Sequence, residues 1–329
     1  MHMVRGRLAP SPTGYMHIGN AWAFLLAWLA ARHEGGHVVL RMEDIDPQRS
    51  RPEYALALME DLRWLGLDWD EGPDIGGQYA PYTQHERLPL YQEALQSLQK
   101  RGLAYPCFCT RKELRSLAGA PHWGDAGAAY PGTCRGLSAA ERQAKLAAGR
   151  KPALRLLCPS EPISFNDALY GVQQCSLHDI GGDFALCRSD GVVAYQLAVA
   201  VDDYAMGITQ VVRGQDILVS TPRQIALLRL LGAESIPQYG HIALLVDEQG
   251  ERLAKRHSSL AIRCIRQQGM TARQLVGLLA YWAGLQAQPA PRSAAELIPL
   301  FSWQRLVRHR RSVPSDLPSL RAACGLCTG

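Results

Sequence analysis

The chain has 329 residues, of which 47% are hydrophobic and 20% are charged, and its formal net charge is +5. This length suffices for two or three substructures around a sizeable core, and the mild charge permits a polyanionic partner without demanding one. The longest apolar run, from Ala21 to Ala31, is shorter than the ~20 residues that span a bilayer, and two prolines and a glycine precede it. We therefore expect a cytoplasmic protein with no membrane contact.

The segment from Arg7 to Asn20 predicts a strand, a loop stiffened by two prolines and a turn, followed by a helix from Ala21 to about Arg32. Gly19 lets the backbone approach a ligand closely, and the start of the helix offers unpaired N–H groups. The helix dipole and these donors favour phosphate, and the imidazole of His17 can donate to phosphate oxygens. The segment indicates an anion site, although a histidine beside a glycine is also common in ordinary turns.

Three acidic residues, Glu43, Asp44 and Asp46, follow a predicted strand from His37 to Met42. The nearly continuous apolar run of this strand is typical of a parallel sheet. Ligands of open α/β sheets bind outside the carboxyl ends of the strands. The three carboxylates could therefore bind a cation or an amino group, or they could simply solvate a loop.

Helices and strands alternate along the first hundred residues. Two amphipathic helices are predicted from Arg51 to Leu65 and from Leu88 to Gly102. This order predicts an α/β fold with a Rossmann-like, doubly wound parallel sheet.

Cysteines cluster in the middle of the chain, where Cys107 and Cys109 are followed by Tyr130 and Cys134. Without an export signal, nine cysteines favour free thiols or a metal site over disulfides. Zinc prefers four ligands in a tetrahedron, so three thiolates need a fourth partner, either His122 or the chemically less usual Tyr130. Three reduced cysteines in a mobile insert are the alternative. Strands between residues 152 and 166 are expected to belong to the same insert.

The second half is predicted to return to the main sheet through a hairpin, with strands at 184–188 and 192–201 around an Asp-Gly turn. Asp202 and Asp203 would then lie at a strand end. Helices are expected from Thr221 to Leu231, where Pro222 occupies the first turn, and from Thr271 to Gly284.

Beyond a proline-rich linker, residues 294–311 predict one or two helices that end in a basic run. This run is either a solvated face or a contact with RNA phosphates. The pair Cys324 and Cys327 has no second pair nearby and is expected to have no metal role. We expect a poorly ordered tail after Ser312.

The segment RLAPSPTGYMHIGN, residues 7–20, resembles the first signature of class I aminoacyl-tRNA synthetases in its glutamyl form, with Asn20 in place of a second histidine. The segment ERLAKR, residues 251–256, resembles the second signature, although Arg252 and Ala254 depart from the usual pattern. Segments similar to glutamyl synthetases lie between them at 40–46, 64–73, 194–201 and 212–216. The resemblance covers about residues 5–311 and is greatest to short members of the family that lack an anticodon-binding domain.

This resemblance implies roles for individual residues. Glutamate would be held by Arg7, Ala9, Ser11, Glu43, Tyr195 and Arg213. ATP, with Mg²⁺, would be held by His17, Gly19, Asn20 and Lys255, of which His17 and Lys255 are the catalytic residues. One structural Zn²⁺ would be held by Cys107, Cys109, Tyr130 and Cys134.

Two of these roles have a definite chemistry. Glu43 would hold the α-ammonium group of glutamate, and Arg213 would hold its γ-carboxylate with two parallel hydrogen bonds. The alternative for Arg213 is a simple ion pair with Asp216. Lys255 would neutralise the triphosphate in the transition state.

The resemblance also implies a catalytic domain in two parts, 1–105 and 171–245, around a zinc-binding insert at 106–170. A signature-loop and helical region at 246–311 and a tail at 312–329 complete the expected organisation. The implied monomeric enzyme forms glutamyl-adenylate from glutamate and ATP without tRNA, and then transfers glutamate to queuosine in the anticodon loop of tRNA(Asp). Its rivals are an ordinary glutamyl-tRNA synthetase that charges a tRNA 3′ end, a nucleotidylyltransferase of the same superfamily, and an inactive tRNA-binding paralogue.

Overall fold

The computed structural model describes residues 3–110, 112–114, 130–253 and 260–323. Its main sheet has six strands in the order β2-β1-β8-β9-β5-β6, and all neighbours are parallel except β5 and β6. The strands are β1 (Arg5–Leu8), β2 (His37–Leu40), β5 (Ile163–Asp167), β6 (Gly171–Cys175), β8 (Gln210–Gly214) and β9 (Gln238–Ile242). The predicted α/β class with a parallel sheet is confirmed, apart from the antiparallel edge strand β6.

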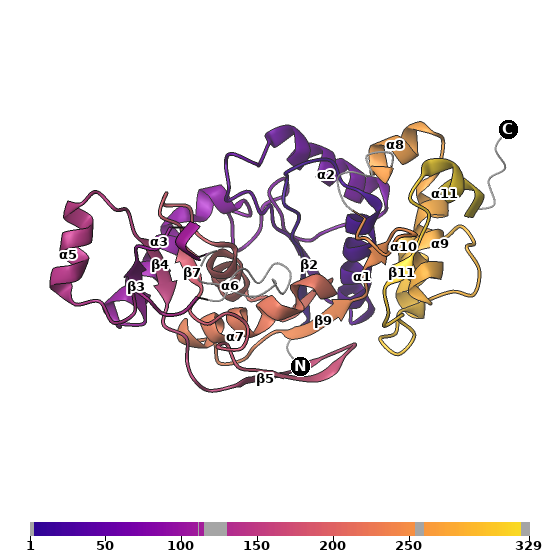
Figure 1. Cartoon of the computed structure of the whole chain (residues 1–329). Helices are drawn as coiled ribbons and strands as arrows, with labels where there is room; N and C mark the ends of the chain where they lie inside the picture. Colours follow the sequence, from indigo (N-terminus) through magenta and orange to yellow (C-terminus); the bar gives the residue numbers. More distant parts are fainter. Residues whose placement is uncertain (1–2, 111, 115–129, 254–259, 324–329) are drawn as a thin grey trace.

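Helices cover this sheet and form the far end of the molecule (Figure 1). The α-helices are α1 (Ile18–His33), α2 (Pro52–Trp64), α3 (Leu88–Lys100), α5 (Ala139–Ala147), α6 (Tyr195–Ala205), α7 (Thr221–Leu230), α8 (Ile262–Gln267), α9 (Ala272–Ala283), α10 (Ala294–Leu297) and α11 (Leu317–Ala323). Short 3₁₀ helices are η1 (Gln84–Arg87), η3 (Gln215–Ser220) and η5 (Ile298–Leu300). Among the described residues, no helix is long and apolar enough to cross a bilayer.

The first helix, α1, lies at the centre of the molecule and contacts β1 and β8. It begins at Ile18, before the predicted start, because His17 and Asn20 cap its first turn reciprocally. Ten of its sixteen residues are buried, which is why its sequence reads as a continuous apolar run.

The cysteine-rich region forms a separate three-stranded sheet, β3-β4-β7, at one end of the molecule (Figure 1). Its strands are β3 (Ala104–Cys107), β4 (Ala153–Leu156) and β7 (Ala185–Cys187). The expectation that all strands between residues 152 and 166 belong to this insert is wrong for β5. That strand pairs with β9, so it extends the main sheet.

The predicted return to the main sheet through a hairpin at 184–201 is also wrong. The first strand, β7, pairs with β4 in the smaller sheet, and residues 195–205 form helix α6. Seven consecutive residues of α6, from Leu197 to Asp203, are buried. A helix buried on all sides shows no amphipathic period, so an apolar run with valines is indistinguishable from a buried strand. Asp202 and Asp203 therefore lie in the last turns of a helix and not at a strand end.

The C-terminal region lies at the other end of the molecule, where α9, α10 and α11 gather (Figure 1). Beyond the short α10 and η5, residues 301–310 have no helix, contrary to expectation. Two short strands, β10 (Leu245–Val246) and β11 (Arg311–Ser312), pair in parallel, and α11 follows them. The expected poorly ordered tail after Ser312 is folded as far as Ala323. Val313 and Leu320 attach it to the protein, since both side chains are buried in the core.

Candidate active site

A cavity of about 540 Å³ opens at the carboxyl ends of β1, β2 and β8. Every residue predicted to bind ATP or glutamate lines it, except Lys255, which lies outside the described residues. They are Arg7, Ala9, Ser11, His17, Gly19, Asn20, Glu43, Tyr195 and Arg213. Residues from four separate segments of the chain thus meet in one cavity.

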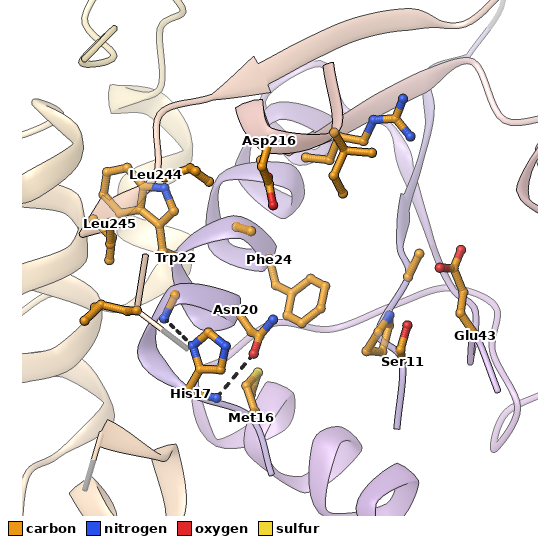
Figure 2. Close-up of a pocket in the computed structure, with 18 of the residues that line it drawn as sticks. Ser11, Met16, His17, Asn20, Trp22, Phe24, Glu43, Asp216, Leu244 and Leu245 are labelled. Atoms are coloured by element: carbon orange, nitrogen blue, oxygen red, sulfur yellow. Dashed lines mark hydrogen bonds between the residues drawn. The ribbon is translucent and has the colours of Figure 1, made fainter. Parts of the chain in front are cut away.

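His17 and Asn20 lie together at the N-terminus of α1 (Figure 2). The backbone N–H of Gly19 donates to Nδ1 of His17 over 3.1 Å, and the N–H of His17 donates to Oδ1 of Asn20 over 3.4 Å. Because Nδ1 accepts a hydrogen bond, a neutral His17 carries its proton on Nε2, which makes Nε2 a donor. A side chain at Gly19 would lie only 3.0 Å from the imidazole, so glycine is needed for this arrangement.

The second signature segment approaches the same cavity. Arg252 forms an ion pair with Asp216, and both residues line the cavity together with Leu253. The alternative in which Arg213 pairs with Asp216 is wrong, since the partner of Asp216 is Arg252.

Glu43 lies away from His17, beside Ser11 (Figure 2). Nη2 of Arg41 donates to Oε1 of Glu43 over 3.0 Å, and Nη1 of Arg41 donates to Oδ1 of Asp203 over 2.7 Å. Nε of Arg7 lies 3.6 Å from the same oxygen of Asp203. Burial raises the pKa of Glu43, and the neighbouring guanidinium groups of Arg41 and Arg7 oppose this shift.

A third buried carboxylate, Asp202, completes this cluster. It accepts hydrogen bonds from Arg87 (2.7 Å), Gln84 (2.8 Å) and Tyr91 (2.9 Å), and Nε of Arg41 lies 3.6 Å away. Burial disfavours the charge of Arg41, but three carboxylates outweigh it and hold its pKa well above the ordinary value. The sequence interpretation assigned no role to Arg41, although an arginine inside an apolar strand is itself a signal of a buried charge partner.

Arg213 differs from Arg41 in its partners. Nη1 donates to Oε1 of Gln224 and Nη2 donates to Oγ1 of Thr221, each over 2.7 Å, and Nε donates to Nε2 of His241 over 3.2 Å. All three acceptors are formally neutral when His241 is neutral. Among the described residues, no carboxylate forms an ion pair with Arg213.

Tyr195 is the first residue of α6, and its side chain remains 40% exposed while lining the cavity. The cavity therefore combines a carboxylate, Glu43, with two buried guanidinium groups, Arg7 and Arg213. A small zwitterion with an additional negative group is complementary to this set of charges.

The three predicted cysteine ligands also come together, in the insert. The sulfur atoms of Cys107, Cys109 and Cys134 lie within 4.8 Å of one another, and those of Cys109 and Cys134 are 3.7 Å apart. Tetrahedral Zn–S bonds of ~2.3 Å place two sulfurs about 3.8 Å apart, so the cluster could hold such a metal. The hydroxyl of Tyr130 lies 3.5 Å from Sγ of Cys107. His122, the rival fourth ligand, lies outside the described residues.

The family profile described as "tRNA synthetases class I (E and Q), catalytic domain" matches residues 3–298, and the chain belongs to this family. The chain is 58% identical to a Glutamyl-Q tRNA(Asp) synthetase of Nitratidesulfovibrio vulgaris, over 96% of this chain and 97% of that protein. It is 51% identical to the Glutamyl-Q tRNA(Asp) synthetase of Symbiobacterium thermophilum, over 95% and 97% of the two chains.

Similarity to glutamate–tRNA ligases is lower and covers less of those proteins. A Glutamate–tRNA ligase 2 of Nitrosococcus oceani is 46% identical, over 84% of this chain but 58% of its own length. The crystal structure of a glutamate–tRNA synthetase from Elizabethkingia anophelis superposes with a TM-score of 0.82 at 27% identity, over 98% of this chain and 70% of that one.

Proposed function

We propose that this protein activates glutamate with ATP to glutamyl-adenylate without tRNA, and transfers the glutamyl group to queuosine in the anticodon loop of tRNA(Asp). The observation that carries the proposal is the similarity to Glutamyl-Q tRNA(Asp) synthetases, which extends over nearly the whole of both chains. The charges that line the cavity support glutamate as the amino acid.

In this proposal, glutamate lies between the carboxylate of Glu43 and the guanidinium of Arg213. Glu43 holds the α-ammonium group, and Arg213 holds the γ-carboxylate. Arg213 has five N–H donors, of which three have partners among the described residues, so two remain for a carboxylate. Ala9, Ser11 and Tyr195 enclose the substrate, and Arg7 lies beside Asp203 at the base of the cavity.

The first chemical step is attack of the glutamate α-carboxylate on the α-phosphorus of ATP, with pyrophosphate as the leaving group. No general base is required, because the nucleophile is already ionised. His17, the N-terminus of α1 and Lys255 supply positive charge and hydrogen-bond donors to the phosphates. Mg²⁺, when bound with ATP, would neutralise further phosphate charge. In the second step, a hydroxyl of the RNA attacks the adenylate carbonyl and AMP leaves.

We also propose that one structural Zn²⁺ is held by Cys107, Cys109, Tyr130 and Cys134. The spacing of the sulfur atoms and the position of the tyrosine hydroxyl support this ligand set. The cluster lies at the end of β3, whose last residue is Cys107, and none of its residues lines the cavity, which supports a structural role.

ATP–pyrophosphate exchange tests the activation step. With purified protein and no RNA, exchange should proceed with glutamate and fail with glutamine. Lys255→Ala should abolish it, whereas Lys100→Ala, at an exposed end of α3, serves as the matched control. Exchange that begins only after tRNA is added would contradict the proposal and favour an ordinary glutamyl-tRNA synthetase.

A further inference from the structure

Arg213 lies at one end of a buried row of hydrogen-bonding side chains that reaches across three strands. Arg213 on β8 and His241 on β9 are register partners, so their side chains lie on the same face of the sheet. Asp167, at the carboxyl end of β5, pairs with Tyr239, two residues before His241. Thr221, at the start of α7, covers this face. Asp167, His241 and Thr221 are each at most 1% exposed.

The hydrogen bonds in this row determine which atom is the donor and which is the acceptor at each contact. Arginine can only donate, so Oγ1 of Thr221 accepts from Nη2 of Arg213 over 2.7 Å. Nε of Arg213 donates to Nε2 of His241 over 3.2 Å, so Nε2 is an acceptor, and the hydroxyl of Thr221, 3.0 Å from Nε2, directs its hydrogen toward it. The proton of a neutral His241 is therefore on Nδ1, which lies 2.6 Å from Oδ2 of Asp167.

Asp167 is held in place by the backbone. Its Oδ1 accepts from the N–H groups of Leu169 (3.0 Å) and Tyr170 (2.9 Å), and its Oδ2 accepts from the N–H of His241 (3.0 Å). Burial alone would raise the pKa of Asp167, but these hydrogen bonds and that of the imidazole lower it, so it stays ionised. Burial also lowers the pKa of His241, which keeps the imidazole neutral at neutral pH.

Arg41 and Arg213 differ in how the protein compensates their positive charge. Arg41 is surrounded by Glu43, Asp202 and Asp203, so its charge is satisfied within the protein. Arg213 is 6% exposed, and its acceptors among the described residues are all uncharged. A buried guanidinium without a contacting carboxylate is costly and favours a ligand that supplies one.

We infer that Asp167, His241 and Thr221 are positioning residues that hold Arg213 by neutral acceptors, so that its charge selects a substrate with a side-chain carboxylate. Asp167 fixes the imidazole tautomer, and His241 and Thr221 fix the guanidinium plane. A flipped tautomer would point an N–H at Arg213 and Thr221 and would displace both. This inference rests on the proposed role of Arg213 in glutamate binding.

Two variants, Thr221→Val and Asp167→Asn, each remove a different hydrogen-bonding group from this row. Thr221→Val removes the hydroxyl but keeps the shape of the side chain, and Thr221→Ser is the control that restores the hydroxyl. In Asp167→Asn, the amide oxygen can serve the N–H groups of Leu169 and Tyr170, which turns the amide nitrogen toward Nδ1 of His241. Such an amide donates where a carboxylate accepts, so it favours the wrong tautomer.

Steady-state exchange kinetics with glutamate, glutamine and ATP test the inference. Thr221→Val and Asp167→Asn should raise KM for glutamate by about tenfold to a hundredfold, as expected for a misaligned binding group, and should reduce the preference for glutamate over glutamine. KM for ATP should change by less than about twofold, and Thr221→Ser should resemble the wild type. If Asp167→Asn fails to fold, Thr221→Val and Thr221→Ser decide alone.

The possible contradictions separate the inference from the proposed function. An unchanged glutamate KM and glutamine discrimination in Thr221→Val would overturn the inference while the wild type remains active with glutamate. If KM for glutamate and KM for ATP changed equally, the substituted residues would have a merely structural role, and the inference would be overturned as well. A wild type that shows no exchange with glutamate would refute the proposed function itself.

Discussion

Arg41→Met removes the positive group that three buried carboxylates share, while keeping a flexible apolar side chain of similar length. Arg41 is fully buried, with oxygen atoms of Asp203 at 2.7 Å, Glu43 at 3.0 Å and Asp202 at 3.6 Å. Removing one partner of a buried ion pair costs roughly 3–5 kcal/mol, because the remaining charges lose their compensation. That cost is a large share of the ~5–15 kcal/mol that stabilises a folded protein.

The same substitution should change the pH dependence of glutamate binding. Arg41 lowers the pKa of Glu43 against the effect of burial, so its removal should raise that pKa further. Glu43 holds an ammonium group only when it is ionised. KM for glutamate in Arg41→Met should therefore be elevated near neutral pH and should fall as the pH rises through the new pKa of Glu43.

Urea unfolding and pH-dependent exchange kinetics measure these two effects. Arg273→Met is the control, because Arg273 forms an ion pair with Glu296 at 2.9 Å in which both side chains are exposed. This control should unfold close to the wild type, since exposed ion pairs contribute little. If Arg41→Met were as stable as Arg273→Met, or if its glutamate KM did not depend on pH, the account of the buried cluster would be refuted.

Two other changes test the insert and the first signature. The wild type should contain about one zinc per chain, as a closed tetrahedral site requires; Cys109→Ala should lower this content, and Cys264→Ala, outside the cluster, should not. A wild type that contains no zinc but folds normally and has normal exchange activity would contradict the zinc proposal. Gly19→Ala places a Cβ 3.0 Å from the ring of His17, so the imidazole must move. We expect kcat for exchange to fall about tenfold or more while KM for glutamate stays nearly unchanged; an unaltered kcat would mean that the position of His17 is unimportant.

The predicted cavity residues could be located because each lies in a short segment that forms a local pattern or resembles a motif of the family. Pro, Gly and His mark the loop before α1, and Glu43 follows an apolar strand whose carboxyl end faces the ligand side of the sheet. Local patterns can be recognised without knowing which segments become neighbours. The structure brings these segments together in one cavity, but their roles in binding stay predictions.

The partners that hold these residues were not predictable, because they are distant in sequence. Arg41 and Asp203 are separated by 162 positions, and Asp167 and His241 by 74. Their contacts depend on the order of strands in the sheet, which hydrophobic periodicity does not determine. The error at α6 has a related cause: a segment buried on every side presents no polar face, and only tertiary packing decides between helix and strand.

We propose that the acceptor of the glutamyl group is queuosine in tRNA(Asp). The most direct measurement incubates the protein with labelled glutamate, ATP and tRNA from cells that either make or lack queuosine, and then maps the label with nucleases. We predict label only on tRNA that contains queuosine, within the anticodon loop of tRNA(Asp). Label on tRNA without queuosine, or on the 3′-terminal adenosine, would contradict the account and identify an ordinary glutamyl-tRNA synthetase.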